Sequence, residues 1–119
     1  MPSTGFNGDV YRLTHENVNF NVPKATPGAY VLGHRKDGAL IVDYVGRSDN
    51  DLRERLLLHA GEKKYERFKF KVFGTVEEAF AKECQLWHDF GEAQFLANEN
   101  HPAPPKGLGV VCPVCRENR

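Results

Sequence analysis

Hydrophobic and polar positions in the first half of the chain alternate with the two-residue period of β-strands. Residues 29–34 and 39–46 are β-rich runs, and the pair Asp37-Gly38 between them is typical of a tight turn because both residue types tolerate positive φ. These runs predict a β-hairpin. Earlier in the chain, apolar residues alternate across 18–22, which predicts a short edge strand within an N-terminal arm, residues 1–27.

After the hairpin the hydrophobic period becomes helical. Residues 51–61 begin with helix-capping residue types and then place apolar side chains at helical spacing, which predicts an α-helix. Residues 68–72 alternate apolar side chains with lysines and predict a third strand. Thr75-Val-Glu-Glu78 has the form of a capping box and begins a long helix whose apolar stripe could continue past Gly91.

Composition and chain length place these elements in one domain. The chain has 119 residues, of which 40% are hydrophobic and 27% charged, as in ordinary globular proteins. Prolines exclude a helix from His101 onward, so residues 101–119 are predicted to form an extended tail that contains Cys112-Pro-Val-Cys115. No apolar run reaches the roughly 20 residues of a membrane helix, and the N-terminus lacks a signal-peptide pattern, so we expect a cytoplasmic protein with no membrane partner.

Charged residues are balanced over the whole chain but unevenly distributed along it. Lysine plus arginine and aspartate plus glutamate number 16 each, so no strong net field attracts nucleic acid. Basic residues nevertheless dominate from 53 to 71, and acidic residues dominate from 77 to 99. The basic stretch could bind a nucleic-acid backbone, or both stretches could be ordinary solvated surfaces. The candidate nucleic-acid-binding residues are Lys63, Lys64, Arg67, Lys69 and Lys71.

Three polar side chains lie at positions where apolar ones would be expected. Arg55 and His59 share a helical stripe with Leu52 and Leu56, so we expect both to lean towards the core. An inward arginine needs an anionic partner, which can be a carboxylate or a phosphate. Glu83 lies at the edge of the apolar stripe of the long helix, where a carboxylate must be paired or bind a metal. A Glu83–Arg55 ion pair and a Mg²⁺ site at Glu83 both satisfy these requirements.

Two tyrosines lie on opposite arms of the predicted hairpin, each two residues from a glycine. Tyr30 ends the tripeptide Gly28-Ala-Tyr30, and Tyr44 begins the tripeptide Tyr44-Val-Gly46. Either tyrosine alone fits core packing in a strand. Arg47 follows directly, close enough in sequence to depress the pKa of a tyrosine or to hold a phosphate.

Together these residues resemble the GIY-YIG nuclease domain. The two tripeptides correspond to its two signatures, with Ala29 where the family usually has isoleucine and Val45 in the second signature. The resemblance covers roughly residues 28–100, and the loop after Arg47 is one residue longer than in many members. The other matches, in chain order, are an arginine and a histidine four residues apart, a metal-binding glutamate and a late asparagine: Arg55, His59, Glu83 and Asn98.

The resemblance implies a Mg²⁺- or Mn²⁺-dependent endonuclease that hydrolyses phosphodiester bonds, with DNA as the expected substrate, on an α+β fold whose small three-stranded, mainly antiparallel sheet is flanked by helices. By this hypothesis Glu83 holds the metal, Tyr44 orients or deprotonates the attacking water and Arg47 tunes the tyrosine. Arg55 neutralises charge at phosphorus, and Asn98 supports the site through hydrogen bonds. Tyr30 and His59 position phosphate and water.

Two other interpretations remain open. The first is a non-catalytic nucleic-acid-binding module on the same fold. The second gives the leading role to the tail, because three cysteines argue against a disulfide framework and Cys112 and Cys115 have the spacing of half a metal knuckle. With Cys84 or His101, or with a second copy of the tail in a dimer, they could bind zinc and form an interaction module. A homodimer or a partner protein could also supply specificity to a nuclease.

Overall fold

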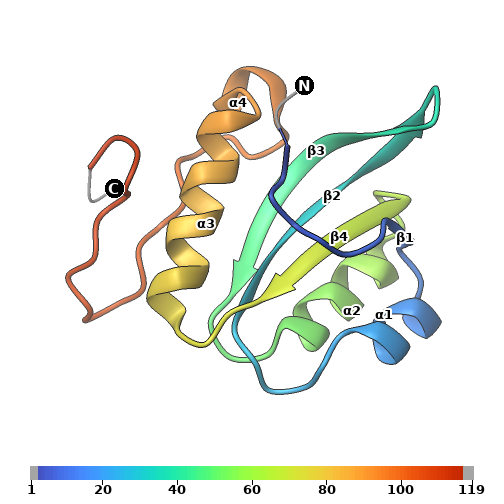
Figure 1. Ribbon diagram of the computed structural model, residues 1–119, viewed down its shortest axis with the longest axis horizontal. Coiled ribbons are helices and arrows are strands. Elements are labelled where there is room, and N and C mark those ends of the chain that lie inside the picture. The colour runs from blue at the N-terminus through green and yellow to red at the C-terminus, as the bar shows by residue number, and fades with distance from the viewer. Residues whose placement is uncertain (1–2, 117–119) are drawn as a thin grey trace.

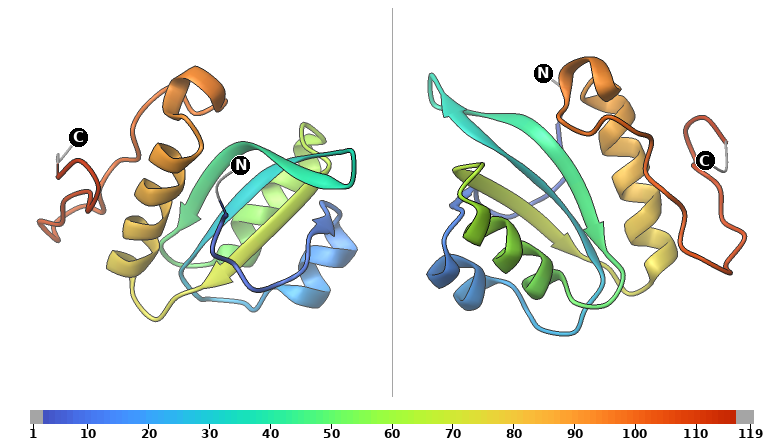
Figure 2. Two further views of the ribbon diagram at one scale, coloured as in Figure 1. Left: turned by 45° about the horizontal axis from the view of Figure 1, so that its top comes forward. Right: turned by 180° about the vertical axis from the view of Figure 1, so that it is seen from behind.

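Four antiparallel strands form one sheet with helices on both of its faces (Figures 1 and 2). The computed structural model describes residues 3–116. Its elements are β1 (Tyr11–Arg12), α1 (His15–Asn21), β2 (Gly28–Lys36), β3 (Ala39–Ser48), α2 (Leu52–Glu62), β4 (Arg67–Val72), α3 (Val76–Asp89) and α4 (Glu92–Phe95). The strand order is β1-β4-β2-β3, so β3 has a free outer edge. The prediction of an α+β fold is confirmed, but the sheet of the described residues has four strands, not three.

The predicted hairpin is formed by β2 and β3. Asp37 and Gly38 connect the strands, and their φ angles of 53° and 81° are the positive values that such a turn requires. Cross-strand register places Tyr30 opposite Gly46. Side chains then alternate between the two faces of the sheet, so Tyr30 packs towards α1 and α2 while Val31 packs towards α3.

The N-terminal arm differs from the prediction, because residues 18–22 lie in and just after helix α1 and form no strand. The Thr14 hydroxyl accepts a hydrogen bond from the Asn17 amide at 3.1 Å and caps the helix. Val18 and Val22 are fully buried, whereas Phe20, which strict alternation would place beside them, is 88% exposed. Val18 and Val22 are four residues apart, so their spacing also fits one face of a helix. The edge strand is β1 instead, and it pairs with β4.

The later elements follow the sequence pattern closely. The Asp51 side chain accepts from the Glu54 amide at the start of α2, and Thr75 accepts from the Glu78 amide at the start of α3. The prediction that the long helix could continue past Gly91 is wrong. Gly91 has a φ of 100°, which ends the helix and turns the chain into the separate short helix α4.

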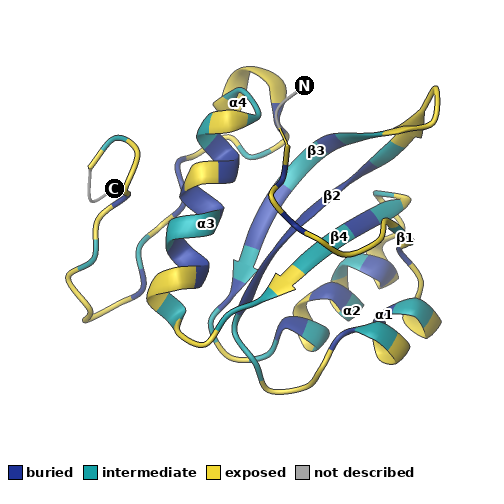
Figure 3. Ribbon diagram, viewed as in Figure 1, coloured by how far each residue is buried: buried dark blue, intermediate teal, exposed yellow. Residues whose placement is uncertain are grey.

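Two hydrophobic clusters lie on opposite sides of the sheet, and β2 is buried between them along most of its length (Figure 3). A third, smaller cluster joins Phe80 and Cys84 of α3 to Cys112 of the tail. The described part of the tail contains no helix or strand and runs along the side of α3 that faces away from the sheet (Figure 1). None of the helices within residues 3–116 has the length and hydrophobicity of a membrane span.

Candidate active site

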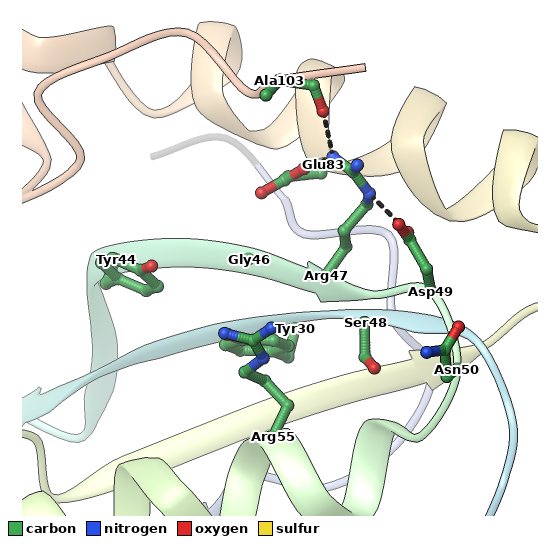
Figure 4. Close-up of a pocket in the computed structure, with 10 residues that line it drawn as sticks. All are labelled: Tyr30, Tyr44, Gly46, Arg47, Ser48, Asp49, Asn50, Arg55, Glu83 and Ala103. Carbon is green, nitrogen blue, oxygen red and sulfur yellow. Dashed lines mark hydrogen bonds and ion pairs between the residues drawn. The ribbon is translucent and has the colours of Figure 1, made fainter. Parts of the chain in front are cut away.

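A cavity of about 370 Å³ lies at the free edge of β3, where side chains from both faces of the sheet meet (Figure 4). Tyr44 belongs to the face covered by α2, and Arg47 belongs to the face covered by α3. Because no strand covers this edge among residues 3–116, side chains of α2 and α3 can reach the same cavity around it. The lining residues are Tyr30, Tyr44, Gly46, Arg47, Ser48, Asp49, Asn50, Arg55, Glu83 and Ala103.

The glycines of the two tripeptides allow close packing around the tyrosines. A Cβ atom at Gly46 would lie 2.4 Å from Tyr30 Cζ and its hydroxyl oxygen, so only glycine lets the Tyr30 ring cross β3 at this point. A Cβ atom at Gly28 would lie 2.6 Å from both a Leu52 methyl carbon and the Lys71 carbonyl oxygen. The glycines therefore position Tyr30 between β3 and α2.

Tyr30 belongs to a hydrogen-bonded chain that the sequence only partly indicates. Its hydroxyl lies 2.8 Å from His59 Nε2, and His59 Nδ1 lies 3.1 Å from the Glu62 carboxylate. Burial raises the pKa of Tyr30 well above its ordinary value, and burial lowers the pKa of His59 although Glu62 opposes that change. Tyr30 and His59 are thus brought together as predicted, while Glu62 was missed because its side chain is largely exposed.

Tyr44 lies beside this chain in an aromatic cluster. Its ring centroid is 6.5 Å from that of Tyr30 and 5.4 Å from that of His59. Burial raises the pKa of Tyr44, the Glu83 carboxylate raises it further, and the Arg55 guanidinium opposes both. The expectation that Arg47 depresses the pKa of this tyrosine is therefore wrong. The positive charge that acts on Tyr44 comes from Arg55.

Arg47 instead holds the carboxylate of Glu83. Its Nη1 donates to Glu83 Oε1 at 2.7 Å and to the Ala103 carbonyl at 2.7 Å, and its Nε donates to Asp49 Oδ1 at 2.8 Å (Figure 4). The guanidinium also lies 5.1 Å from the centre of the Phe80 ring. Glu83 is 9% exposed, and burial raises its pKa while the charge and hydrogen bond of Arg47 oppose the rise. The alternative ion pair between Glu83 and Arg55 is not formed.

Arg55 differs from its predicted inward orientation. Leu52 and Leu56 are fully buried, but Arg55 is exposed and reaches the cavity from its solvent side. Its guanidinium points into the cavity that Tyr30 also lines (Figure 4). Within residues 3–116 it forms no ion pair or hydrogen bond, which leaves its donors available to an anion.

Asn98 contacts the backbone of β3 and lies outside the cavity. Its Oδ1 accepts from the Val45 amide at 2.9 Å and its Nδ2 donates to the Val45 carbonyl at 2.7 Å. The side chain thus makes the pair of hydrogen bonds that a neighbouring strand would make. The Asn98 carbonyl in turn accepts from Trp87 Nε1 at 3.3 Å. Asn98 is therefore a positioning residue for the strand that carries both Tyr44 and Arg47.

The predicted nucleic-acid-binding residues do not form one surface. Arg67, Lys69 and Lys71 alternate with the phenylalanines of β4 and lie on the face of the sheet opposite Tyr30. Lys63 and Lys64 follow α2 on the side of the cavity, where Lys64 lies over the Tyr65 ring. The Tyr65 ring is 5.9 Å from that of Tyr44. None of the five candidates lines the cavity.

The cavity offers oxygen donors that fit a divalent cation. Arg47 engages Glu83 Oε1, and Oε2 forms no hydrogen bond to residues 3–116. The Asp49 carboxylate lies in the same cavity and was missed in the sequence, where it was one of several candidate helix caps. Mg²⁺ typically takes one or two carboxylates and keeps several waters, so this donor set fits it. Ala103 was also missed, because it contributes a backbone carbonyl that leaves no mark on the sequence pattern.

A second group of potential ligands lies beyond α3, where the tail returns to the helix. One ligand atom from each of His88, His101, Cys112 and Cys115 lies within 4.8 Å of the others, so these residues could hold a metal ion. The structure brings His101 to the predicted cysteine pair. Cys84 is excluded from this group: it packs against Phe80 and Cys112, and burial raises the pKa of its thiol.

His88 was missed, because the sequence of α3 gives no sign of where the tail will meet the helix.

In comparisons with known proteins, no family model, curated protein or solved structure matched the chain. The residues around the cavity and the group beyond α3 are the features of the chain that bear on its function.

Proposed function

We propose that this chain is a metal-dependent endonuclease that hydrolyses phosphodiester bonds, with DNA as its substrate and a GIY-YIG type of mechanism. The observation that carries the proposal is the convergence of Tyr44, Arg55 and Glu83 on one cavity. They come from β3, α2 and α3, which are distant in sequence and lie on different sides of the sheet. A purely structural role would not require a phenol, a guanidinium and a carboxylate to face the same opening.

Arg55 is the anion-binding group of this proposal. Its unengaged guanidinium can donate two parallel hydrogen bonds to non-bridging phosphate oxygens and stabilise the charge that grows on them. Glu83, with Asp49 beside it, would hold Mg²⁺ or Mn²⁺, which when bound supplies positive charge next to the phosphate. Arg47 is a positioning residue, because it fixes the Glu83 carboxylate and makes no contact that requires substrate.

Tyr44 is the group that would orient the attacking water. Its pKa is raised, so the phenol keeps its proton at neutral pH and acts through hydrogen bonding rather than as a phenolate base. Tyr30 and His59 act through their hydrogen bond as neutral groups, because burial raises the pKa of Tyr30 and lowers the pKa of His59. These roles favour water orientation over deprotonation by Tyr44, the two possibilities that the sequence left open.

The test is cleavage of labelled linear, nicked, branched and single-stranded DNA by the purified chain, with Mg²⁺ present or omitted. We expect Arg55→Ala and Glu83→Gln each to lower the rate by about 10²–10³-fold, the usual loss when a charge-stabilising group is removed. Matched controls are Arg35→Ala and Glu77→Gln, which change exposed residues outside the cavity. Equal rates for the site variants and the wild type, with all proteins folded by circular dichroism, would refute the assignment.

A second candidate is a nucleic-acid-binding module without catalysis. The observation that favours it is the Arg47–Glu83 ion pair, which engages one oxygen of the carboxylate that a metal would need. Fluorescence anisotropy with labelled DNA separates the two functions. A binding module retains DNA without any divalent ion and loses it as salt rises, whereas a nuclease stops cleaving when Mg²⁺ is omitted.

A further inference from the structure

We propose that His88, His101, Cys112 and Cys115 bind one Zn²⁺ ion that fastens the tail to α3. The four ligands come from three segments: the last turn of α3, the start of the tail and the turn near its end. This site is separate from the Mg²⁺ site at Glu83, and none of its ligands lines the cavity. It requires no second copy of the chain, because one chain supplies a complete set of four.

The spacing of the ligand atoms fits a tetrahedral metal. With Zn–S near 2.3 Å and Zn–N near 2.0 Å, the edges of a zinc tetrahedron are roughly 3.3–3.8 Å long. His101 Nε2 already lies 3.4 Å from Cys115 Sγ, and no pair of ligand atoms is more than 4.8 Å apart. Small side-chain movements would therefore complete the coordination without moving the helix.

Both histidines are oriented by a second hydrogen bond, as zinc ligands usually are. His88 Nδ1 lies 2.5 Å from the Glu92 carboxylate, and His101 Nδ1 lies 2.9 Å from the Pro102 carbonyl. Each contact favours a proton on Nδ1 and leaves the Nε2 lone pair for a metal. His88 Nε2 is buried and has no hydrogen-bond partner within residues 3–116. An unpartnered buried nitrogen is unfavourable unless a ligand satisfies it.

The donor types favour zinc over the alkaline-earth ions. Two sulfurs and two imidazole nitrogens in a tetrahedral arrangement suit Zn²⁺, whereas Mg²⁺ and Ca²⁺ require oxygen ligands. The cysteines lie on a tight turn in which the Arg116 amide donates to the Cys112 carbonyl at 2.8 Å. This turn directs both sulfurs to the same side, as in zinc knuckles with a C-x₂-C spacing.

The zinc site would also set one wall of the candidate active site, a consequence that rests on the proposed function. Ala103 is two residues from His101, and its carbonyl accepts the hydrogen bond from Arg47 that accompanies the Arg47–Glu83 pair. Fastening His101 to α3 therefore keeps this carbonyl in place. Loss of zinc would release it and weaken the positioning of Glu83.

The primary test is the metal content of the full chain, purified without chelator and measured by inductively coupled plasma mass spectrometry. We expect about one zinc per chain, retained in Cys84→Ala and lost in Cys115→Ser and His88→Ala. Cys84→Ala is the matched control, because Cys84 contacts Cys112 but lies outside the ligand group. The proposal would be overturned if the zinc content fell equally in Cys84→Ala, or if wild-type protein with three free thiols took up no zinc.

Cobalt substitution tests the site without any variant, in case a ligand variant does not fold. Addition of Co²⁺ to the metal-free wild-type chain should give the intense visible bands of tetrahedral cobalt and sulfur-to-cobalt charge transfer, and one equivalent of Zn²⁺ should remove them. Weak bands typical of octahedral cobalt would contradict the ligand set. Glu92→Gln should lower zinc affinity about 10–100-fold in competition with a chelating dye, while Glu99→Gln should not.

Zinc binding and cleavage can fail independently. Glu83→Gln should retain its zinc while losing cleavage, because Glu83 is not among the four ligands. A chain that holds zinc but cleaves no DNA would leave the zinc site standing and remove the nuclease. Mg²⁺ must be withdrawn by omission in the cleavage assays, since a chelator would remove both ions.

Discussion

At the scale of single residues, the candidate active site depends on charge held at the edge of a hydrophobic core. Glu83 is 9% exposed and accepts a hydrogen bond from Arg47, which itself contacts Asp49 and Ala103. Burial still dominates, so the pKa of Glu83 is raised. A carboxylate that is held charged against its burial lowers stability, and such a cost is common where a group serves ligand binding.

This destabilisation predicts how the stability of the wild type relative to Glu83→Gln changes with pH. Because the pKa of Glu83 is higher in the folded than in the unfolded chain, the folded state binds more protons between the two values, and stability falls as pH rises through that window. The variant lacks this dependence. We expect the melting temperature of the wild type to drop relative to Glu83→Gln as pH rises above the ordinary pKa of a glutamate, about 4.3.

Thermal unfolding of both proteins across this pH range checks the sign, with Glu77→Gln as a control that follows the wild type. A wild type that gains stability over Glu83→Gln with rising pH would instead indicate a stabilising ion pair with Arg47. The same variant should lose cleavage, so stability and activity are expected to change in opposite directions.

At the scale of elements, local patterns predicted most of the fold where one period dominates the sequence. The hairpin, α2, β4 and the start of α3 follow from turn chemistry, caps and alternation. The pattern failed at residues 18–22, because Val18 and Val22 satisfy both a strand and a helix, and the Thr14 cap decides for the helix. The resemblance placed Tyr30 and His59 in one site, but the Arg47–Glu83 contact joins β3 to α3 across 36 residues of sequence and has no local signal.

The helical assignment of residues 15–21 predicts that truncating two apolar side chains, Val18 and Phe20, will affect stability very differently. Val18 is fully buried and Phe20 is 88% exposed. We expect Val18→Ala to lower the free energy of unfolding by about 1.5–3 kcal/mol, the value of a buried aliphatic side chain. Phe20→Ala should change it by less than about 0.5 kcal/mol. Urea unfolding followed by circular dichroism measures both, and a large loss for Phe20→Ala would favour the strand.

At the scale of the whole molecule, the tail connects two sites that the sequence presents as unrelated. The segment after α4 holds the outer edge of β3 through Asn98, and the tail that follows supplies Ala103 to the cavity and returns to α3 at His88. A small cluster of buried side chains, Phe80, Cys84 and Cys112, packs beneath its final turn. The position of the tail therefore depends on the proposed metal much more than the sheet does.

This dependence predicts where the chain opens when zinc is removed. Lys106 is exposed in the tail, and Lys63 is exposed at the end of α2. With free zinc at about 100 times its Kd, the open state of the tail should be roughly a hundredfold rarer than in the metal-free chain. We expect trypsin to cut after Lys106 much faster once a chelator is present, while its rate after Lys63 stays the same.

Mass spectrometry of the early fragments distinguishes this local opening from general unfolding. If both sites become sensitive together, zinc stabilises the entire domain and the tail is not an independent unit. If the rate after Lys106 does not change, the metal does not fasten the tail. In that case Ala103 must hold its place beside Arg47 through the Arg47 hydrogen bond itself and through the contacts that Asn98, just before the tail, makes with β3 and Trp87.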